Sequence, residues 1–328
     1  MSHLTTANTL HDVRWHHFLR APEMKSMAFL IVVVGIFSFM NPAFLSFASF
    51  MSILQALAFI GIVSVGMTLL IVAGEFDLSV GSVATLANVS AALLMVKTGV
   101  DPVVSLLIGM GIGLLVGAVN AILVLTFAVP SFIATIGMMF MARGIAVWLS
   151  AAKPILPLPP IANQIGDIHV LGLSLSVFVF LLLVVVGAFV LARTNFGCLV
   201  RATGGNAEAA QIAGVKTKRT KFLLFMLSGA LAGFAGTLTL VHFGTGTHEM
   251  GNGWELTAIA AVVIGGTSLF GGTGTVIGTF IGLMILHAIA FGMVAARIDP
   301  WWQISATGVI MLLSLTAEAV DKRRRKLA

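Results

Sequence analysis

The sequence predicts an all-α fold, namely a polytopic membrane protein with about ten transmembrane helices and with both termini in the cytoplasm. Hydrophobic residues make up 59% of the 328 residues and charged residues only 9%, which is far outside the composition of soluble domains. The 18 Lys and Arg residues gather in clusters beside apolar runs rather than along one face. The formal net charge of +6 therefore indicates orientation in a membrane and not binding to nucleic acid.

Apolar runs separated by helix-breaking residues give the position of each expected helix. The breaks fall at 74–77, at 99–102 and at Pro130. The ten expected spans are 25–44, 50–73, 79–97, 102–125, 130–151, 173–192, 222–243, 254–270, 275–295 and 300–319. Between the fifth and sixth spans, segment 152–172 holds prolines at 154, 157, 159 and 160. We expect an extended exterior loop there, because proline disrupts a helix interior.

The first span has an alternative interpretation as a secretory signal peptide. Lys25 precedes the apolar run 27–39, and small residues follow near Ser46, as in a signal with a cleavage site. Asn41 and Pro42 interrupt that pattern, and an uncleaved helix over 25–44 fits the thickness of the bilayer. We therefore prefer the uncleaved helix.

The distribution of basic residues gives the orientation, since Lys and Arg favour cytoplasmic loops. With the N-terminus inside, fourteen basic residues lie on the cytoplasmic side, and only Lys97, Lys153 and Arg297 lie outside. An even number of spans is favoured, because an odd number would place one basic end outside. The expected organisation is a cytoplasmic tail over 1–26, a transmembrane domain over 27–320 and a basic cytoplasmic tail over 321–328.

The longest polar interval is the expected cytoplasmic loop 193–221, which contains six basic residues and a single acid, Glu208. Between the basic groups, 206–214 combines helix-forming Ala, Glu and Gln with a terminal Gly, which predicts a short helix on the membrane surface. A short helix outside the bilayer is suited to contact a partner. The alternative is a basic loop that faces the membrane and has no partner.

Polar residues at the break 74–77 and in the third span form a candidate translocation path. Asp77 and Ser79 follow the break and are able to cap the next helix or to lie beside the path. Ser82, Thr85 and Asn88 repeat at three-residue spacing and so share one helix face, which could line a route for a hydroxylated solute. Buried hydrogen bonds between helices explain this stripe equally well.

Four more ionisable residues, Glu75, Arg143, Glu255 and His287, lie in or beside the spans. Charged groups are costly in hydrocarbon and usually face a cavity or one another. We assign structural roles to Arg143 and His287. Glu75 and Glu255 are the plausible coupling carboxylates if ions drive the transport.

The sequence gives no support for an enzyme. It contains no Gly-x-x-x-x-Gly-Lys-Ser/Thr motif for ATP, no His-Glu-x-x-His and no Gly-x-Ser-x-Gly. A single cysteine, Cys198, allows neither an internal disulfide nor a cysteine metal site. We therefore expect no catalytic residues, no metal and no cofactor.

Glycines at four-residue spacing predict closely packed helices. One series is Gly109, Gly113 and Gly117, and the other is 274, 278 and 282. Aligning the second half of the chain with the first pairs Gly74 with 271 and 81 with 278, which is weak evidence for an internal repeat.

Three strings in order carry a resemblance to a known family. They are GEFDLSVGS at 74–82, TGGNAEAA at 203–210 followed by Gly214, and AAVVIGGTSLFGG at 260–272. Together they resemble the permease subunit of ribose-type bacterial ABC sugar importers, and the similarity covers about 27–320. The resemblance implies a multi-pass protein of the bacterial inner membrane. It also implies cytoplasmic ATP-binding subunits, a periplasmic sugar-binding protein and a second permease copy or paralogue as partners.

The resemblance also assigns the loop 193–221 as the segment that couples the permease to the ATPase. The residues that match this pattern are Gly204, Gly205, Asn206, Glu208, Ala209, Ala210 and Gly214. Glu208 is expected to pair with a basic group of the ATPase or locally with Arg201. The alternative function is an ion-coupled secondary transporter or facilitator for a small polar solute, which ten spans and an internal repeat would also fit.

Overall fold

The computed structural model describes residues 22–299 and 301–327. Most of the predicted N-terminal tail therefore lies outside the described residues. The long helices are α2 (Pro22–Met40), α3 (Phe47–Val72), α4 (Val80–Thr98), α5 (Pro102–Leu125), α6 (Ser131–Ser150), α8 (Leu175–Arg193), α11 (Thr217–Phe243), α13 (Val276–Ala295) and α14 (Trp301–Leu327). The shorter elements are the 3-10 helix η1 (Pro42–Leu45), α7 (Pro160–Gly166), α9 (Asn195–Gly205), α10 (Ala207–Ile212), α12 (Trp254–Ile264) and the strands β1 (His169–Val170) and β2 (Leu173–Ser174).

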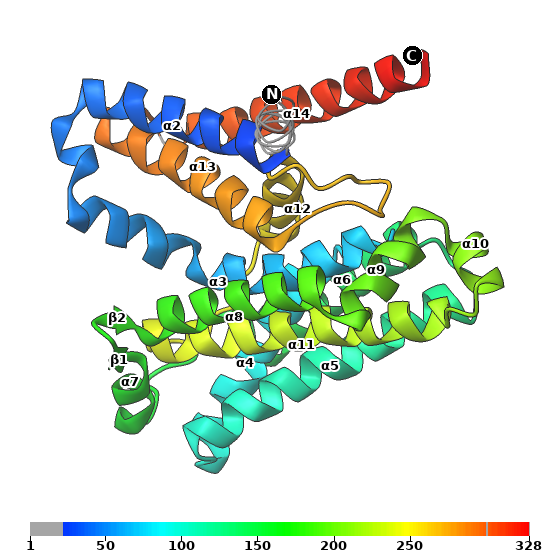
Figure 1. Cartoon of the computed structure of the whole chain (residues 1–328). Helices are drawn as coiled ribbons and strands as arrows, with labels where there is room; N and C mark the ends of the chain where they lie inside the picture. Colours follow the sequence, from blue (N-terminus) through cyan, green and yellow to red (C-terminus); the bar gives the residue numbers. More distant parts are fainter. Residues whose placement is uncertain (1–21, 300, 328) are drawn as a thin grey trace, which may run out of the picture.

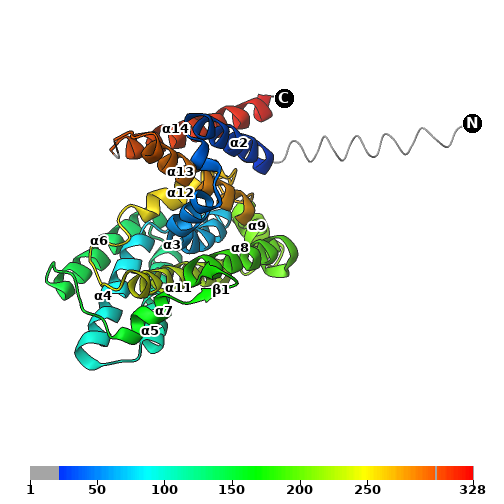
Figure 2. The same ribbon diagram turned by 90° about the vertical axis from the view of Figure 1, so that its left-hand side faces the viewer.

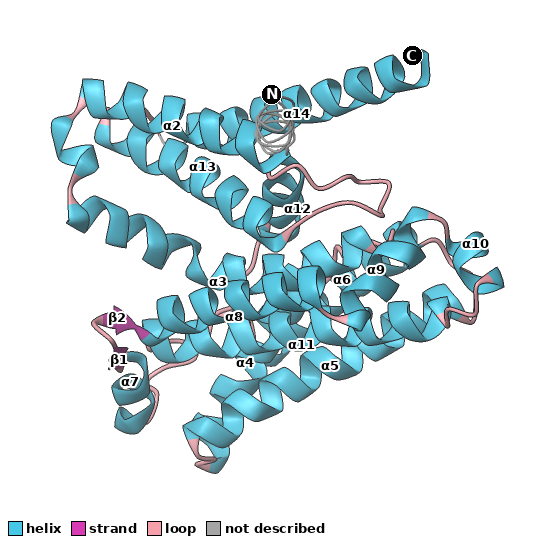
Figure 3. Ribbon diagram, in the orientation of Figure 1, coloured by secondary structure: helices cyan, strands magenta, loops and turns pink. Residues whose placement is uncertain are grey.

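The predicted all-α membrane fold is confirmed. Strands occur only as the two-residue pair β1 and β2 within the described chain (Figure 3). Eight helices in the same residues are long and apolar enough to cross a membrane. The total of ten spans and the cytoplasmic position of the termini stay predictions.

Two of the expected spans differ from the structure by six residues or more at one end. Helix α12 ends at Ile264, and residues 265–275 form a loop, so the helix stops six residues before the predicted end at 270. Gly265 and Gly266 explain this early stop, since glycine favours leaving the helix. Helix α14 runs to Leu327, and the predicted basic tail therefore continues the last helix.

The long helices pack in two groups around α3. Figures 1 and 2 show α2, α13 and α14 on one side of the molecule and α4, α5 and α11 on the other. Helix α3 contacts α8, α11, α12 and α13, and its second half, from Leu57 to Val72, is completely buried. A helix that is apolar all round is suited to a core or to a membrane span, and its contacts with four other helices place α3 in the core.

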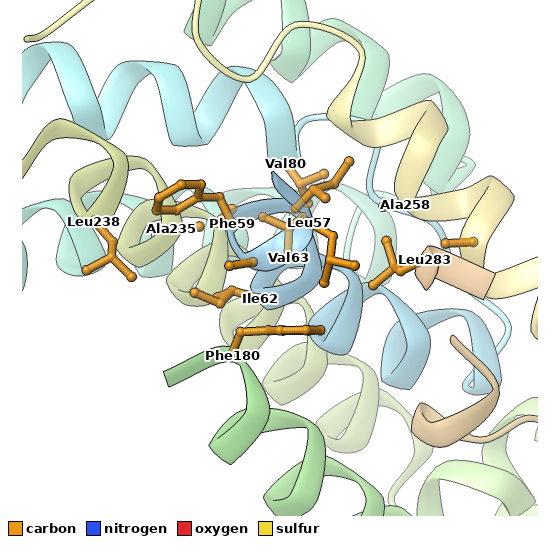
Figure 4. Packing of buried hydrophobic residues seen from close by; sticks show 14 of the residues in the cluster. Leu57, Phe59, Ile62, Val63, Val80, Phe180, Ala235, Leu238, Ala258 and Leu283 are labelled. Carbon is orange, nitrogen blue, oxygen red and sulfur yellow. The ribbon is translucent and has the colours of Figure 1, made fainter. Parts of the chain in front are cut away.

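The core gathers where side chains of α3 meet five other helices. Figure 4 shows Leu57, Ile62 and Val63 of α3 in one cluster with Phe180, Leu238 and Leu283, which come from α8, α11 and α13. Phe180 is fully buried and lies over Gly61, where a Cβ would lie 2.3 Å from the Phe180 ring. Fewer than a third of the residues of the outer helices α2, α5, α6 and α8 are buried, which leaves their apolar faces for lipid or other subunits.

The first glycine series packs as predicted. A Cβ on Gly113 would lie 2.0 Å from the carbonyl oxygen of Gly229, and one on Gly229 would lie 2.1 Å from the carbonyl oxygen of Gly113. Helices α5 and α11 therefore touch through their backbones. In the second series, Gly278 and 282 pack α13 against α12 in the same way, but Gly274 lies in the preceding loop against Thr267.

The predicted extended loop 152–172 is more ordered than expected. It contains the helix α7, which begins at Pro160, and the strand β1, which pairs with β2 directly after the loop, with His169 opposite Ser174. Proline is well tolerated in the first turn of a helix, and this explains why a proline-rich stretch holds one. Ile155 pairs with Gly246 through two backbone hydrogen bonds of 2.8 and 3.1 Å. The loop is therefore fixed to the segment that follows α11.

Candidate functional site

The short helix predicted over 206–214 is present as α10. Asn206 caps it by accepting a hydrogen bond of 2.9 Å from the backbone N–H of Ala209. Gly214 follows the helix with φ +87°, a left-handed conformation that glycine adopts without strain. Glu208 and Ala209 are exposed in the first turn, whereas Ala210 is buried. The helix thus presents a polar outer face and anchors itself through one small side chain.

Glu208 has no ion-pair partner among the described residues, and Arg201 instead donates from Nε to the carbonyl oxygen of Leu191. The predicted local pairing of Glu208 with Arg201 is therefore not formed. Ile212, at the end of the same helix, is 86% exposed. An unpaired acid beside an exposed aliphatic side chain is suited to contact another protein.

Helix α9, directly before α10, was not predicted. Thr194 caps its start through Gly197, and Gly204 and Gly205 form its end. Residues 195–205 mix Gly, polar and apolar residues and show no clear helical pattern in the sequence. Thr194, a preferred N-cap residue, was the signal from which the helix could have been predicted.

Gly204 joins α9 to two distant segments through backbone contacts alone. Its Cβ position would lie 1.8 Å from the carbonyl oxygen of Val72 and 2.7 Å from the backbone nitrogen of Gly272. The N–H of Gly272 donates a 2.8 Å hydrogen bond to that same oxygen of Val72. Gly271 packs against Gly204 and against Gly74. We call this contact of residues 72–74, 204–205 and 271–272 the glycine junction.

An ion pair lies close to the junction in the sequence. Glu75 accepts from the Nζ of Lys221 at 2.6 Å. The side chains are 12% and 17% exposed, so the pair is shielded from most of the solvent. It connects the end of α3 with the first turns of α11, the helix that follows the loop 193–221.

Asp77 and Ser79 form a buried polar cluster with Asn120 of α5. The Oδ1 atom of Asp77 accepts from the N–H of Ser79 at 2.9 Å, from its hydroxyl at 2.5 Å and from the Nδ2 of Asn120 at 3.4 Å. Burial raises the pKa of the Asp77 carboxyl, and the bonds from Ser79 and Asn120 lower it in part. The Oδ2 atom of Asp77 has no partner in the described chain.

The stripe on α4 divides into two kinds of position. Asn88 and Thr85 bind other segments of the chain. Asn88 donates to the carbonyl oxygen of Gly236 at 3.0 Å and accepts from the N–H of Thr247 at 2.9 Å, and Thr85 contacts the carbonyl oxygen of Met250. Ser82 differs, because its buried hydroxyl has no partner in the described residues and lines a pocket.

This pocket has a volume of about 350 Å³ and lies between α4, α6 and the segment before α12. Its lining residues are Ser82, Met139, Phe140, Arg143, Val147, His248, Glu249, Asn252 and Glu255. Arg143 and Glu255 are two of the intramembrane charges noted in the sequence. The sequence analysis did not predict that these two residues line one pocket, because they are far apart along the chain. Their opposite charges within apolar spans were a signal that they lie close together.

The segment between α11 and α12 runs along α4 toward the start of that helix. Thr247 contacts Asn88, Met250 contacts Thr85, and Gly251 packs against Gly81. Polar side chains of α4 thereby satisfy backbone groups of a segment that is not helical, as irregular backbone beside a cavity requires. Among the described residues no group of His, Cys, Asp and Glu could hold a metal ion.

His287, the last of the intramembrane ionisable residues, lies apart from the pocket in α13. Its Nδ1 bonds the carbonyl oxygen of Leu283 at 3.0 Å, which is the helix's own preceding turn. This contact fits the structural role that the sequence suggested.

The chain matches the family described as the branched-chain amino acid transport system permease component over residues 49–315. It is 36% identical to the probable ABC transporter permease protein YphD of Escherichia coli over 93% of this chain and 92% of the relative. It is 33% identical to the autoinducer 2 import system permease protein LsrC of Enterobacter, over 90% and 85% of the two chains. Identity to the ribose import permease protein RbsC of Bacillus subtilis is 33%, over 87% and 89%. None of the solved structures matches the chain.

Proposed function

We propose that this chain, which belongs to the family of branched-chain amino acid transport system permease components and is similar to ribose import permeases, moves a sugar or similar polyhydroxylated solute by alternating access. The chain is the transmembrane subunit of an ABC importer and a multi-pass protein of the inner membrane. Relatives named as ribose import permeases support a monosaccharide as the solute. Energy comes from a separate ATPase subunit, since the sequence holds no ATP-binding motif of its own.

The observation that carries this proposal is the connection of α10 to the transmembrane helices. A docked ATPase drives transport only through a segment that is tightly joined to those helices. The glycine junction joins α9, which precedes α10, to the end of α3 and to the loop before α13. The proposed coupling surface therefore comprises Gly204, Gly205, Asn206, Glu208, Ala209, Ala210 and Gly214. Gly204 and Ala210 pack against the chain itself, and Glu208 and the neighbouring Ile212 are directed to the ATPase.

The proposed path follows the polar positions of α4. Asp77 and Ser79 mark one end, and Ser82 opens to the pocket. Thr85 and Asn88 hold the segment 245–250 beside the path instead of facing a solute. A second permease copy or a paralogue completes the path, and it would cover part of the exposed apolar surface of the outer helices.

The proposed site for a periplasmic sugar-binding protein is the surface formed by 152–172 and the start of 244–253. The pairing of Ile155 with Gly246 brings these two loops together, and an ordered loop loses little freedom on docking. Residues 247–253 run along α4 and are assigned to the path. A cysteine at the exposed Gln164 should react more slowly with a maleimide when loaded binding protein is present.

The coupling surface is tested with Glu208→Lys and Gly214→Val in the complex with its ATPase. Both variants should insert in the membrane but lose ATP-dependent uptake and retain less ATPase on purification. Valine at 214 strains the left-handed backbone by about 1–2 kcal/mol, whereas the control Gly214→Asn tolerates this conformation. Normal uptake by both variants with the ATPase bound would contradict the coupling role. Uptake without any ATPase would instead favour a secondary transporter.

A further inference from the structure

The pocket beside Ser82 contains polar atoms that the chain itself leaves without partners. These are the Oγ of Ser82, the Nδ1 of His248 and the Oε2 of Glu255, each buried and without a hydrogen bond in the described residues. A buried polar atom without a partner costs about 1–3 kcal/mol, so such atoms rarely gather without reason. Their common position at one cavity of about 350 Å³ indicates a partner from outside the chain.

Arg143 fixes the wall of this pocket. Its Nη1 donates to the hydroxyl of Thr85 at 3.1 Å and to the carbonyl oxygens of His248 and Met250, both at 3.0 Å. The Nη1 atom of Arg143, on α6, thus connects α4 to the segment before α12. The other guanidinium nitrogens have no hydrogen bond within the described chain, so they are available to a bound solute.

Gly81 leaves room for the carboxylate of Glu255. A Cβ at this position would lie 2.4 Å from the Oε2 of Glu255 and 2.2 Å from the carbonyl oxygen of Gly251. Glu255 is only 8% exposed, and Arg143 lies near enough to interact with it electrostatically. A carboxylate at this depth needs hydrogen-bond donors, and hydroxyl groups of a solute would supply them.

The charges of the lining indicate the class of solute. Arg143 contributes one positive charge, and the lining also contains two carboxyl groups, those of Glu249 and Glu255. The pocket therefore has no positive excess with which to attract an anion. Phe140, Met139 and Val147 form an apolar wall, which suits the carbon face of a sugar ring, and the volume lies within the range of small-molecule sites, about 300–1,000 Å³.

We propose that this pocket is a solute-binding site of the permease and that it takes a neutral polyhydroxylated solute rather than an anion. The proposal rests on the proposed function, which it extends from the path in general to one site. Glu255 and Ser82 bind the hydroxyl groups, while Arg143 positions the segment that carries His248. Selection of the solute is thereby shared between this chain and the binding protein.

The test measures protection of a cysteine in the pocket, independently of transport. In a Cys198→Ser background, Asn252→Cys places a thiol at an exposed position of the lining. Purified complex of the permease with its ATPase, without nucleotide, is labelled with a maleimide in the presence of D-ribose, D-xylose, myo-inositol or D-gluconate. A neutral compound should slow the labelling and D-gluconate should not. Gln164→Cys on α7 is the control, whose labelling should not change.

Variants of the lining identify the groups that bind. Glu255→Gln should raise by about tenfold the solute concentration that halves the labelling rate, since hydrogen bonds to a charged group are the stronger kind. Ser82→Ala removes one hydroxyl at a fully buried position and should also raise this concentration. It is a smaller change than Glu255→Gln, so it provides the test if Glu255→Gln does not fold. Unchanged protection in both folded variants would refute the assignment of these groups.

Parallel measurement of ATP-driven uptake in membrane vesicles separates the two proposals. Uptake of a tested neutral compound without protection of Asn252→Cys would overturn the pocket and leave the proposed function intact. Protection without ATP-driven uptake would overturn the proposed function and leave the pocket intact. Equal protection by D-gluconate would refute the assigned class of solute. If no compound is taken up and no compound protects the thiol, the result would count against both proposals.

Discussion

Replacing Gly204 with alanine tests whether the glycine junction joins the surface helices to the transmembrane core. The new methyl group would lie 1.8 Å from the carbonyl oxygen of Val72 and 2.7 Å from the nitrogen of Gly272. Backbone atoms cannot rotate away as a side chain can, so α9 must move by about an ångström or more. Overpacking of this kind costs about 1–3 kcal/mol, and loss of the hydrogen bond between Gly272 and Val72 adds about 1 kcal/mol.

Gly205→Ala is the matched control. Its Cβ would meet only the Cα of Gly272, at 3.9 Å, which is an ordinary contact. Both glycines close the same helix α9, and alanine raises helix propensity at each position by about 1 kcal/mol. The control should therefore be as stable as the parent or slightly more stable, and Gly204→Ala should be about 2–4 kcal/mol less stable than this control.

The assay combines stability with coupling. Thermal unfolding of the purified complex reports the loss at the junction, and the ratio of solute taken up to ATP hydrolysed reports coupling. Gly204→Ala should lower both the unfolding temperature and this ratio. If Gly204→Ala and Gly205→Ala unfold at the same temperature and transport with the same ratio, the backbone contacts of Gly204 do not connect α9 to the core, and the reasoning fails.

Three further predictions concern packing and polar contacts. Gly113→Ala should destabilise the protein by about 1–3 kcal/mol in thermal unfolding, because its Cβ meets the backbone of α11, whereas Gly111→Ala on the same helix faces open space and should not. Glu75→Lys should reduce uptake, and the second change Lys221→Glu should restore at least half of the loss, because the 2.6 Å pair is reformed with its charges exchanged. Asn88→Leu should lower the unfolding free energy by about 1–3 kcal/mol, because it removes three hydrogen bonds to two segments; an unchanged midpoint would contradict this role.

Hydropathy and helix breakers were sufficient to predict the long helices. A helix that crosses a bilayer needs about 20 apolar residues, and this requirement marks each run directly in the sequence. The same signals were weaker for α12, where the expected span ran to 270 but Gly265 and Gly266 end the helix after Ile264. The short helix α10 was predicted because its cap and its terminal glycine are local features, and Asn206 and Gly214 take those positions in the structure.

The pocket was not predicted, because it depends on packing between segments that are distant in the chain. Spacing placed Ser82, Thr85 and Asn88 on one face of α4, but the sequence does not show which neighbour covers each residue. In the structure, Asn88 and Thr85 are covered by the segment after α11, and Ser82 is left at the cavity. Periodicity thus identifies a polar face, and tertiary contacts decide which of its members are available to a solute.

The glycine junction consists of main-chain atoms, and this composition determines what it responds to. Amide and carbonyl groups do not titrate near neutral pH, and dissolved salt screens them much less than it screens full charges. The nearby pair of Glu75 and Lys221 carries full charges and is partly exposed. Two contacts at the same end of α3 therefore differ in their dependence on the medium. The glycine junction should therefore keep its contacts at ionic strengths that weaken the ion pair of Glu75 and Lys221.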